Sequence, residues 1–149
     1  LTTAIASIIN NVEHHAPDAR LDGILIESMI NNAILELMAS LRRDPQFGLV
    51  LTIASGGVMT EILQDASTVL VPADDISLLA ALDSLRIAPL FDGFRGGQAA
   101  SRTAVLDQIK GLVSLMKDTP DIVEIEINPI MVGKDYACCA DALINISST

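Results

Sequence analysis

The pattern that most constrains the fold is a short alternation of polar and apolar residues near the end of the chain. Residues 124–128 read Glu-Ile-Glu-Ile-Asn, within an apolar segment that runs from residue 122 to residue 132. Successive side chains of a β-strand point to opposite faces, so Glu124, Glu126 and Asn128 share one face and the isoleucines share the other. Pro129 follows at once, and a residue without a backbone N–H suits a sheet edge or a strand end.

A second strand is predicted directly after the first, over residues 136–146. If Lys134 and Asp135 are the two loop residues of a hairpin, the register places Asn128 opposite Asp141. Asp141 stands in a stretch otherwise made of small and apolar residues. A carboxylate in such surroundings needs a partner.

These two strands bring three oxygen-bearing side chains together in the predicted register. Glu126, Asn128 and Asp141 would converge as ligands for a hard cation such as Mg²⁺. The same alternation also describes an ordinary half-exposed strand whose charged residues face water. The pattern alone leaves both interpretations open.

The rest of the chain predicts a mixture of helices and strands in one domain of 149 residues. We expect helices at 2–15, 58–63, 74–85 and 99–117, and further strands at 23–29, 34–41, 49–54 and 67–71. Hairpins join some of these strands and helices separate others. The fold class is therefore α/β (α+β), with a mixed, partly antiparallel sheet flanked by helices.

Composition excludes several classes of function. The chain has 19 acidic and 9 basic residues and a net charge of −10, which disfavours nucleic-acid binding. No apolar run approaches the roughly 18 residues of a membrane span, so no membrane partner is expected. The two cysteines, Cys138 and Cys139, are adjacent and poorly placed to form a disulfide with each other, which favours a reducing, cytoplasmic location.

The segment Glu126-Ile127-Asn128-Pro129, followed by Asp141, resembles the metal-binding end of a known domain. This is the ATP-grasp domain of acyl-CoA synthetases that form a nucleoside diphosphate, a family related to the β subunit of succinyl-CoA synthetase. The resemblance implies that Asn128 and Asp141 bind Mg²⁺. It also implies that Glu126 lies beside the transferred phosphoryl group and acts in catalysis.

Other segments resemble the same family and occur in the same order, from about residue 20 to residue 146. They are Glu27–Met29, Glu36, Arg42–Gly48, Gly56-Gly57 with Glu61 and Asp65, and Phe94–Gly96. The resemblance implies that the chain crosses the adenine near Glu27 and Met29 and that Glu36 lies close to the nucleotide. The candidates for nucleotide binding are therefore Glu27, Met29, Glu36, Gly56, Gly57 and Arg95.

Two of these segments have a simpler interpretation. Gly56-Gly57 would let backbone N–H groups approach a phosphate, but two glycines also describe a plain tight turn. Arg42 and Arg43 would steer a phosphate or CoA, or make surface ion pairs. We expect one of the two arginines to be structural.

The family resemblance implies a parent enzyme that joins a carboxylic acid to CoA, with Mg²⁺ and ATP or ADP as cofactors. The phosphoryl group would pass through a histidine. Residues 1–149 would form only the later part of the ATP-grasp domain, without its first subdomain and without the CoA-binding half, so we expect the piece to be inactive alone. The partners would be the nucleotide and a CoA-binding domain or subunit, with homo-oligomerisation left open.

Two alternatives come from other classes of protein. In one, the chain is a synthetase-like regulatory module of a protein lysine acetyltransferase. In the other, it is an interaction domain derived from ATP-grasp whose metal site is dead. The retained Glu126, Asn128 and Asp141 speak against such decay.

Overall fold

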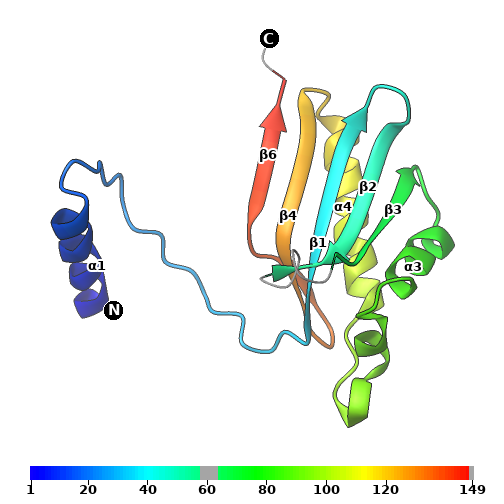
Figure 1. The fold of residues 1–149 in the computed structure, drawn as a ribbon, viewed down its shortest axis with the longest axis horizontal. Coiled ribbons are helices and arrows are strands. Elements are labelled where there is room, and N and C mark those ends of the chain that lie inside the picture. The colour runs from blue at the N-terminus through cyan, green and yellow to red at the C-terminus, as the bar shows by residue number, and fades with distance from the viewer. Residues whose placement is uncertain (58–63, 148–149) are drawn as a thin grey trace.

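The computed structural model describes residues 1–57 and 64–147, in which six strands form one sheet with helices on one face (Figure 1). The strand order is β3-β2-β1-β4-β5, and β6 also pairs with β4. The elements are α1 (Thr2–His15), β1 (Leu35–Asp44), β2 (Gly48–Ser55), β3 (Ala66–Val71), α3 (Asp75–Asp83), η2 (Ala88–Asp92), η3 (Phe94–Gly96), α4 (Arg102–Asp118), β4 (Ile122–Val132), β5 (Ala137–Cys139) and β6 (Ala142–Ile146). The helix expected at 58–63 and Glu61 lie outside the described residues.

The expected α/β (α+β) fold class, with helices and a sheet predicted to be mixed and partly antiparallel, is confirmed. All strand pairs in the described residues are antiparallel. The predicted bounds of β4 match the structure, and those of β1, β2 and β3 differ by a few residues at most. The last predicted strand is divided into β5 and β6.

One face of the sheet carries the hydrophobic core. Every second residue of β1 is buried there, and α4 adds a stripe at helical spacing. The buried residues of these two elements are Leu35, Leu37, Ala39, Leu41, Val105, Leu106, Ile109 and Met116. The opposite face has no helix against it in the described part of the chain (Figure 1). Its residues are more polar.

Side-chain caps begin both helices that cover the sheet. The Asp74 carboxylate accepts the backbone N–H of Ser77 over 2.8 Å, and the Ser101 hydroxyl accepts that of Ala104 over 3.2 Å. The hydrogen bonds from Ser77 hold the pKa of Asp74 below its ordinary value. The predicted start of α3 is therefore confirmed, whereas α4 begins at Arg102, three residues later than expected.

The strand predicted at 23–29 is wrong. This segment has no regular secondary structure, and it joins α1 to β1 apart from the sheet (Figure 1). Leu25 and Met29 are 81% and 82% exposed. An apolar run becomes a strand only when a neighbour pairs with its backbone groups, and no described strand pairs with this one.

A β-bulge interrupts the pairing of β4 with β1. Ile130 pairs with Leu37 and Ile127 with Ala39, so Asn128 and Pro129 together oppose one residue of β1. Pro129 thus lies within an interior strand, not at the sheet edge or strand end that its missing N–H suggested. The bulge explains this position, because its extra residue lies outside the regular ladder.

Within the described residues, no helix is both long enough and apolar enough to span a bilayer.

Candidate functional site

The hairpin between β4 and β5 has the predicted register. The N–H of Gly133 donates to the carbonyl of Tyr136 over 2.9 Å, so Lys134 and Asp135 are the two loop residues. Further along, the N–H of Asn128 donates to the carbonyl of Asp141 over 3.2 Å. The two candidate metal ligands are therefore direct cross-strand neighbours.

Asp141 lies at the break between β5 and β6. Ala140 still donates to the carbonyl of Pro129 over 3.0 Å, and regular pairing resumes at Ala142 opposite Ile127. The Asp141 carboxylate is exposed and accepts the N–H of Ala142 over 2.8 Å. This local hydrogen bond orients the carboxylate.

The glycine pair contacts the same site from the end of β2. The N–H of Gly57 donates to Oδ1 of Asn128 over 2.9 Å, and the N–H of Gly56 donates to the carbonyl of Glu36 over 2.9 Å. A Cβ at Gly57 would lie 1.7 Å from Oε2 of Glu36, so that carboxylate lies against the glycine backbone. Four candidates from three parts of the chain, Glu36, Gly56, Gly57 and Asn128, are thus in contact.

The two glutamates of β4 have different surroundings on the open face. Glu124 accepts hydrogen bonds from Oγ of Ser40 over 3.4 Å and from Nδ2 of Asn145 over 3.0 Å. Glu126 lies between Ser40 and Leu143 in the register, and its carboxylate has no hydrogen bond or ion pair within the described residues. Glu126 is therefore a carboxylate of this face that a ligand can engage without displacing a partner among the described residues.

Sequence reasoning missed Ser40 and Asn145. Both are polar residues on the open face, and the pairing of β1 and β6 with β4 places them beside the glutamates. The same alternation that selected Glu124 and Glu126 would have found them once the neighbouring strands had been put in register.

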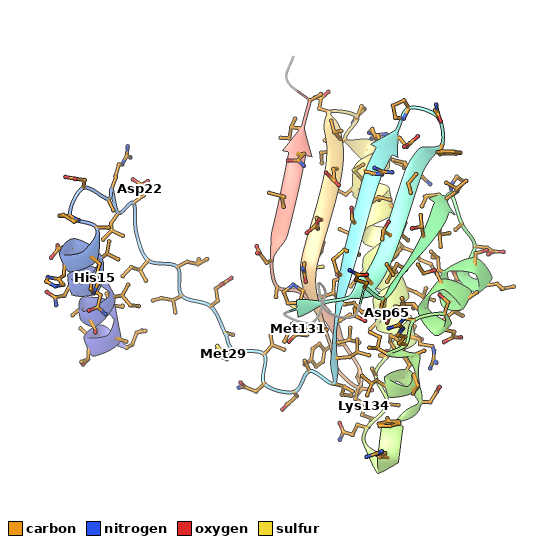
Figure 2. All side chains as sticks on the ribbon, in the orientation of Figure 1. His15, Asp22, Met29, Asp65, Met131 and Lys134 are labelled. Carbon is orange, nitrogen blue, oxygen red and sulfur yellow. The ribbon has the colours of Figure 1, made fainter. Side chains whose placement is uncertain are left out.

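Three candidates lie elsewhere in the described structure. Glu27 and Met29 are exposed on the segment that joins α1 to the sheet, and Figure 2 shows Met29 away from the strands. Arg95 lies in η3 with φ 52°, and its guanidinium stacks on the ring of Phe94 at 5.2 Å. Their roles in nucleotide binding stay predictions.

Of the two neighbouring arginines, one has a structural role, as expected. Arg42 is exposed and pairs with Asp44 at 3.7 Å. Hydrogen bonds from the backbone N–H groups of Gln46 and Phe47, with a smaller contribution from Arg42, hold the pKa of Asp44 below its ordinary value. Arg43 is the structural one, because its guanidinium donates to backbone carbonyls at the end of α4 and the start of β4.

The donor atoms of this site suit a hard cation. Asn128 and Asp141 offer an amide and a carboxylate oxygen on adjacent positions, and the Glu126 carboxylate is two residues away on the same strand. No group of three or more His, Cys, Asp or Glu side chains fit to hold a metal occurs in residues 1–57 and 64–147. Mg²⁺ is commonly held by one or two protein oxygens, with water and substrate phosphates completing its coordination. The residues present therefore fit Mg²⁺ that arrives with a phosphate ligand.

Comparison with known proteins identifies relatives along almost the whole chain. The profile of the family described as ATP-grasp domain matches residues 1–146. The β subunit of acetate–CoA ligase (ADP-forming) I from Pyrococcus furiosus is 33% identical over 139 residues, which cover 93% of this chain and 60% of that subunit. Acetate–CoA ligase (ADP-forming) I from Archaeoglobus fulgidus is 31% identical over 132 residues, 89% of this chain and 19% of that ligase. The chain thus spans about three fifths of the first relative and about a fifth of the second.

A solved structure has the same fold. It is the dinucleotide-forming acetyl-coenzyme A synthetase 1 of Ca. Korarchaeum cryptofilum with coenzyme A, acetyl-coenzyme A and a phosphorylated phosphohistidine segment. The TM-score is 0.86 at 27% identity, over 98% of this chain and 65% of that one. A structure of the same synthetase with coenzyme A and Mg-AMPPCP matches 76% of this chain and 53% of that one, with a TM-score of 0.71 at 26% identity.

Proposed function

Because this chain belongs to the ATP-grasp domain family, we propose that it serves an acyl-CoA synthetase that forms a nucleoside diphosphate. In this role it binds Mg²⁺ and ATP or ADP, and it supports phosphoryl transfer between the nucleotide and a phosphohistidine. The relatives that match most of the chain are ADP-forming acetate–CoA ligases, which supports this proposal.

The observation that carries the proposal is the pairing of Asn128 with Asp141. The backbone hydrogen bond between them, 3.2 Å long, places an amide and a carboxylate on facing positions of two strands. Asn128 and Asp141 would hold Mg²⁺ there, and the cation would supply positive charge against the charge that shifts during phosphoryl transfer. The role of these two residues is therefore to position the cation, and no nucleophile from this chain is needed.

Glu126 has a separate role in this proposal. Its carboxylate lies on the open face and has no hydrogen-bond partner among the described residues. An imidazole N–H of an incoming histidine can donate to it, and this bond would orient the opposite ring nitrogen toward the phosphoryl group. Glu126 thereby acts as an orienting acceptor for the histidine.

The remaining parts of the reaction belong outside this chain. The match to this chain covers 60% of the Pyrococcus β subunit and 19% of the Archaeoglobus ligase. We propose that another ATP-grasp segment completes the nucleotide cleft and that a CoA-binding domain or subunit supplies the histidine. Glu27 and Met29 would reach the adenine in that assembly, and Arg95 would contact an anionic group.

Calorimetric titration of the complete synthetase with ADP, at several Mg²⁺ concentrations, tests the metal site. Asn128→Ala and Asp141→Ala should each weaken the Mg²⁺-dependent part of ADP binding by tenfold or more, as the loss of a direct ligand implies. Asn10→Ala and Asp135→Ala are matched controls on α1 and on the hairpin loop. Unchanged metal dependence in both site variants would refute the assignment.

A further inference from the structure

A buried carboxylate of the family-like segment that begins at Gly56 has no role in the proposed function. Asp65 is 8% exposed, just before β3 at the lower end of the sheet in Figure 2. Its Oδ2 accepts the hydroxyl of Ser55 over 2.9 Å, and the backbone N–H of Arg86 lies 3.0 and 2.9 Å from its two oxygens. Asp65 and Ser55 are the buried polar residues in the described part of the chain.

Asp65 is joined by two hydrogen bonds to Ser55, the residue directly before the glycine pair. Besides the side-chain bond, the N–H of Ser55 donates to the carbonyl of Asp65 over 3.0 Å. Ser55 is the last residue of β2, so fixing it also fixes where Gly56 and Gly57 begin. We refer to the two hydrogen bonds between Ser55 and Asp65 as the loop clamp.

A continuous series of contacts leads from the loop clamp to the candidate metal ligand. Gly56 follows Ser55 and donates to the carbonyl of Glu36, and a Cβ at Gly56 would lie 2.4 Å from the carbonyl carbon and oxygen of Leu37. Gly57 comes next and donates to Oδ1 of Asn128 over 2.9 Å. Ser55 of the clamp therefore lies two residues before the N–H that contacts Asn128.

The Gly57 N–H determines the orientation of the Asn128 carboxamide, that is, the positions of its oxygen and its NH₂ group. A carboxamide has an acceptor oxygen and a donor NH₂ group, and rotation exchanges them. A donor fixed against Oδ1 keeps the oxygen on one side and occupies one of its two lone pairs, which leaves the other for a cation. Groups that orient a metal ligand in this way contribute strongly to metal affinity.

We propose that Asp65 is a positioning residue for the metal site, acting through Ser55 and the glycine pair on Asn128. The inference rests on the proposed function of Asn128 as a Mg²⁺ ligand. A purely structural Asp65 would stabilise the fold without affecting the Asn128 carboxamide. The two roles differ in what a change at Asp65 does to the Gly57 N–H and to metal affinity.

The test uses the complete synthetase and compares Asp65→Asn and Ser55→Ala with the wild type and with Asp92→Asn. Asp92 is a suitable control, because its carboxylate also joins two elements, through Arg102, but has no contact with the loop clamp. Two quantities are measured: the affinity for Mn²⁺ in the presence of ADP, and the hydrogen-exchange rate of the Gly57 amide without metal. Ser55→Ala removes one hydrogen bond and provides a second route if Asp65→Asn does not fold.

We expect both clamp variants to weaken Mn²⁺ binding by about tenfold, in the range found for residues that orient metal ligands. The Gly57 amide should exchange about fivefold faster, as the loss of one hydrogen bond implies. Asn128→Ala should accelerate Gly57 exchange similarly, and Asp92→Asn should change neither quantity.

The outcomes separate this inference from the proposed function. If the wild type binds Mn²⁺ and both clamp variants keep its affinity and its Gly57 exchange rate within twofold, the positioning role of Asp65 is overturned and the metal site stands. If the wild type does not bind Mn²⁺, the proposed function fails. In that case, the hydrogen-exchange rate of the Gly57 amide without metal still decides whether Asp65 orients the Asn128 carboxamide.

Discussion

Arg43 on β1 donates from Nε to the carbonyl oxygen of Ile122, the first residue of β4, over 2.8 Å. Its Nη2 also donates to the carbonyls of Met116 and Thr119, at the end of α4. The last carbonyls of a helix have no partner within it, so this guanidinium satisfies groups that the helix itself cannot. One side chain thereby ties α4 to two strands of the sheet.

Replacing Arg43 by alanine should lower the free energy of unfolding by about 2–3 kcal/mol, because several charge-assisted hydrogen bonds to partly buried carbonyls are lost. Arg42→Ala is the matched control. Its side chain is 59% exposed, so the expected change is within about 0.5 kcal/mol. Urea unfolding of both variants measures the difference, and equal losses would contradict the assigned role of Arg43.

Gly56→Ala should destabilise the protein by about 1–3 kcal/mol through overpacking. A Cβ there would lie 2.4 Å from the carbonyl carbon and oxygen of Leu37, and backbone atoms cannot move aside. Gly111→Ala should change the stability in the opposite direction. Gly111 is inside α4 with open space around it, so alanine should stabilise the helix by about 0.5–1 kcal/mol. Chemical denaturation should therefore give shifts of opposite direction, and a stable Gly56→Ala variant would exclude the close approach.

The ion pair of Asp92 with Arg102 predicts a pH dependence of stability. The hydrogen bond from Arg102 holds the pKa of Asp92 below its ordinary value of 3.8. A carboxyl whose pKa is lowered by folding stabilises the folded state above its unfolded pKa and loses this effect as the pH falls through the folded value. Asp92→Asn should therefore lower the melting temperature at pH 7, and the gap to the wild type should close below about pH 4.

Thermal melts between pH 7 and pH 2 check this prediction. Asp135→Asn on the hairpin loop is the control, because its carboxylate makes no ion pair within the described residues. A gap for Asp92→Asn that stays constant over the whole range would contradict the assigned ion pair.

The adjacent cysteines should react at different rates. Burial, and to a lesser degree the neighbouring Cys138, raises the pKa of the Cys139 thiol. Its Sγ also donates to Oε1 of Gln108 over 3.4 Å, whereas Cys138 is exposed. Since the thiolate is the reactive form, iodoacetamide at pH 8 should modify Cys138 first. Peptide mass spectrometry follows the order, which should vanish in denaturant; equal rates in the folded protein would argue against burial of Cys139.

The sequence predicts the strand pair of the site well, because its signal is local. Alternation marks β4, and two loop residues determine the register that puts Asn128 opposite Asp141. The same kind of signal failed at 23–29, where the apolar run has no strand to pair with. An apolar segment carries no information about whether a neighbour is present to complete its hydrogen bonds.

The contact between Gly57 and Asn128 could not be predicted in this way. A backbone N–H and a side chain 71 positions apart meet only after three strands have assembled, and such a bond leaves no periodic trace in the sequence. The bulge at Pro129 was missed for a related reason, because proline also suits an edge or a strand end. The contrast between Arg42 and Arg43 was accessible only in part, since alternation puts them on opposite faces but does not reveal the carbonyls that Arg43 meets.

The bulge at Asn128 and Pro129 also limits which sequence changes β4 can tolerate. Up to Asn128, the polar positions of β4 lie on the open face, whereas Ile130 and Val132 are buried in the core. Without the extra residue, the alternation would continue unbroken and turn both apolar side chains out toward the polar face. A deletion of one residue at this point would therefore displace the candidate metal ligand Asn128 and the core residues Ile130 and Val132 relative to each other.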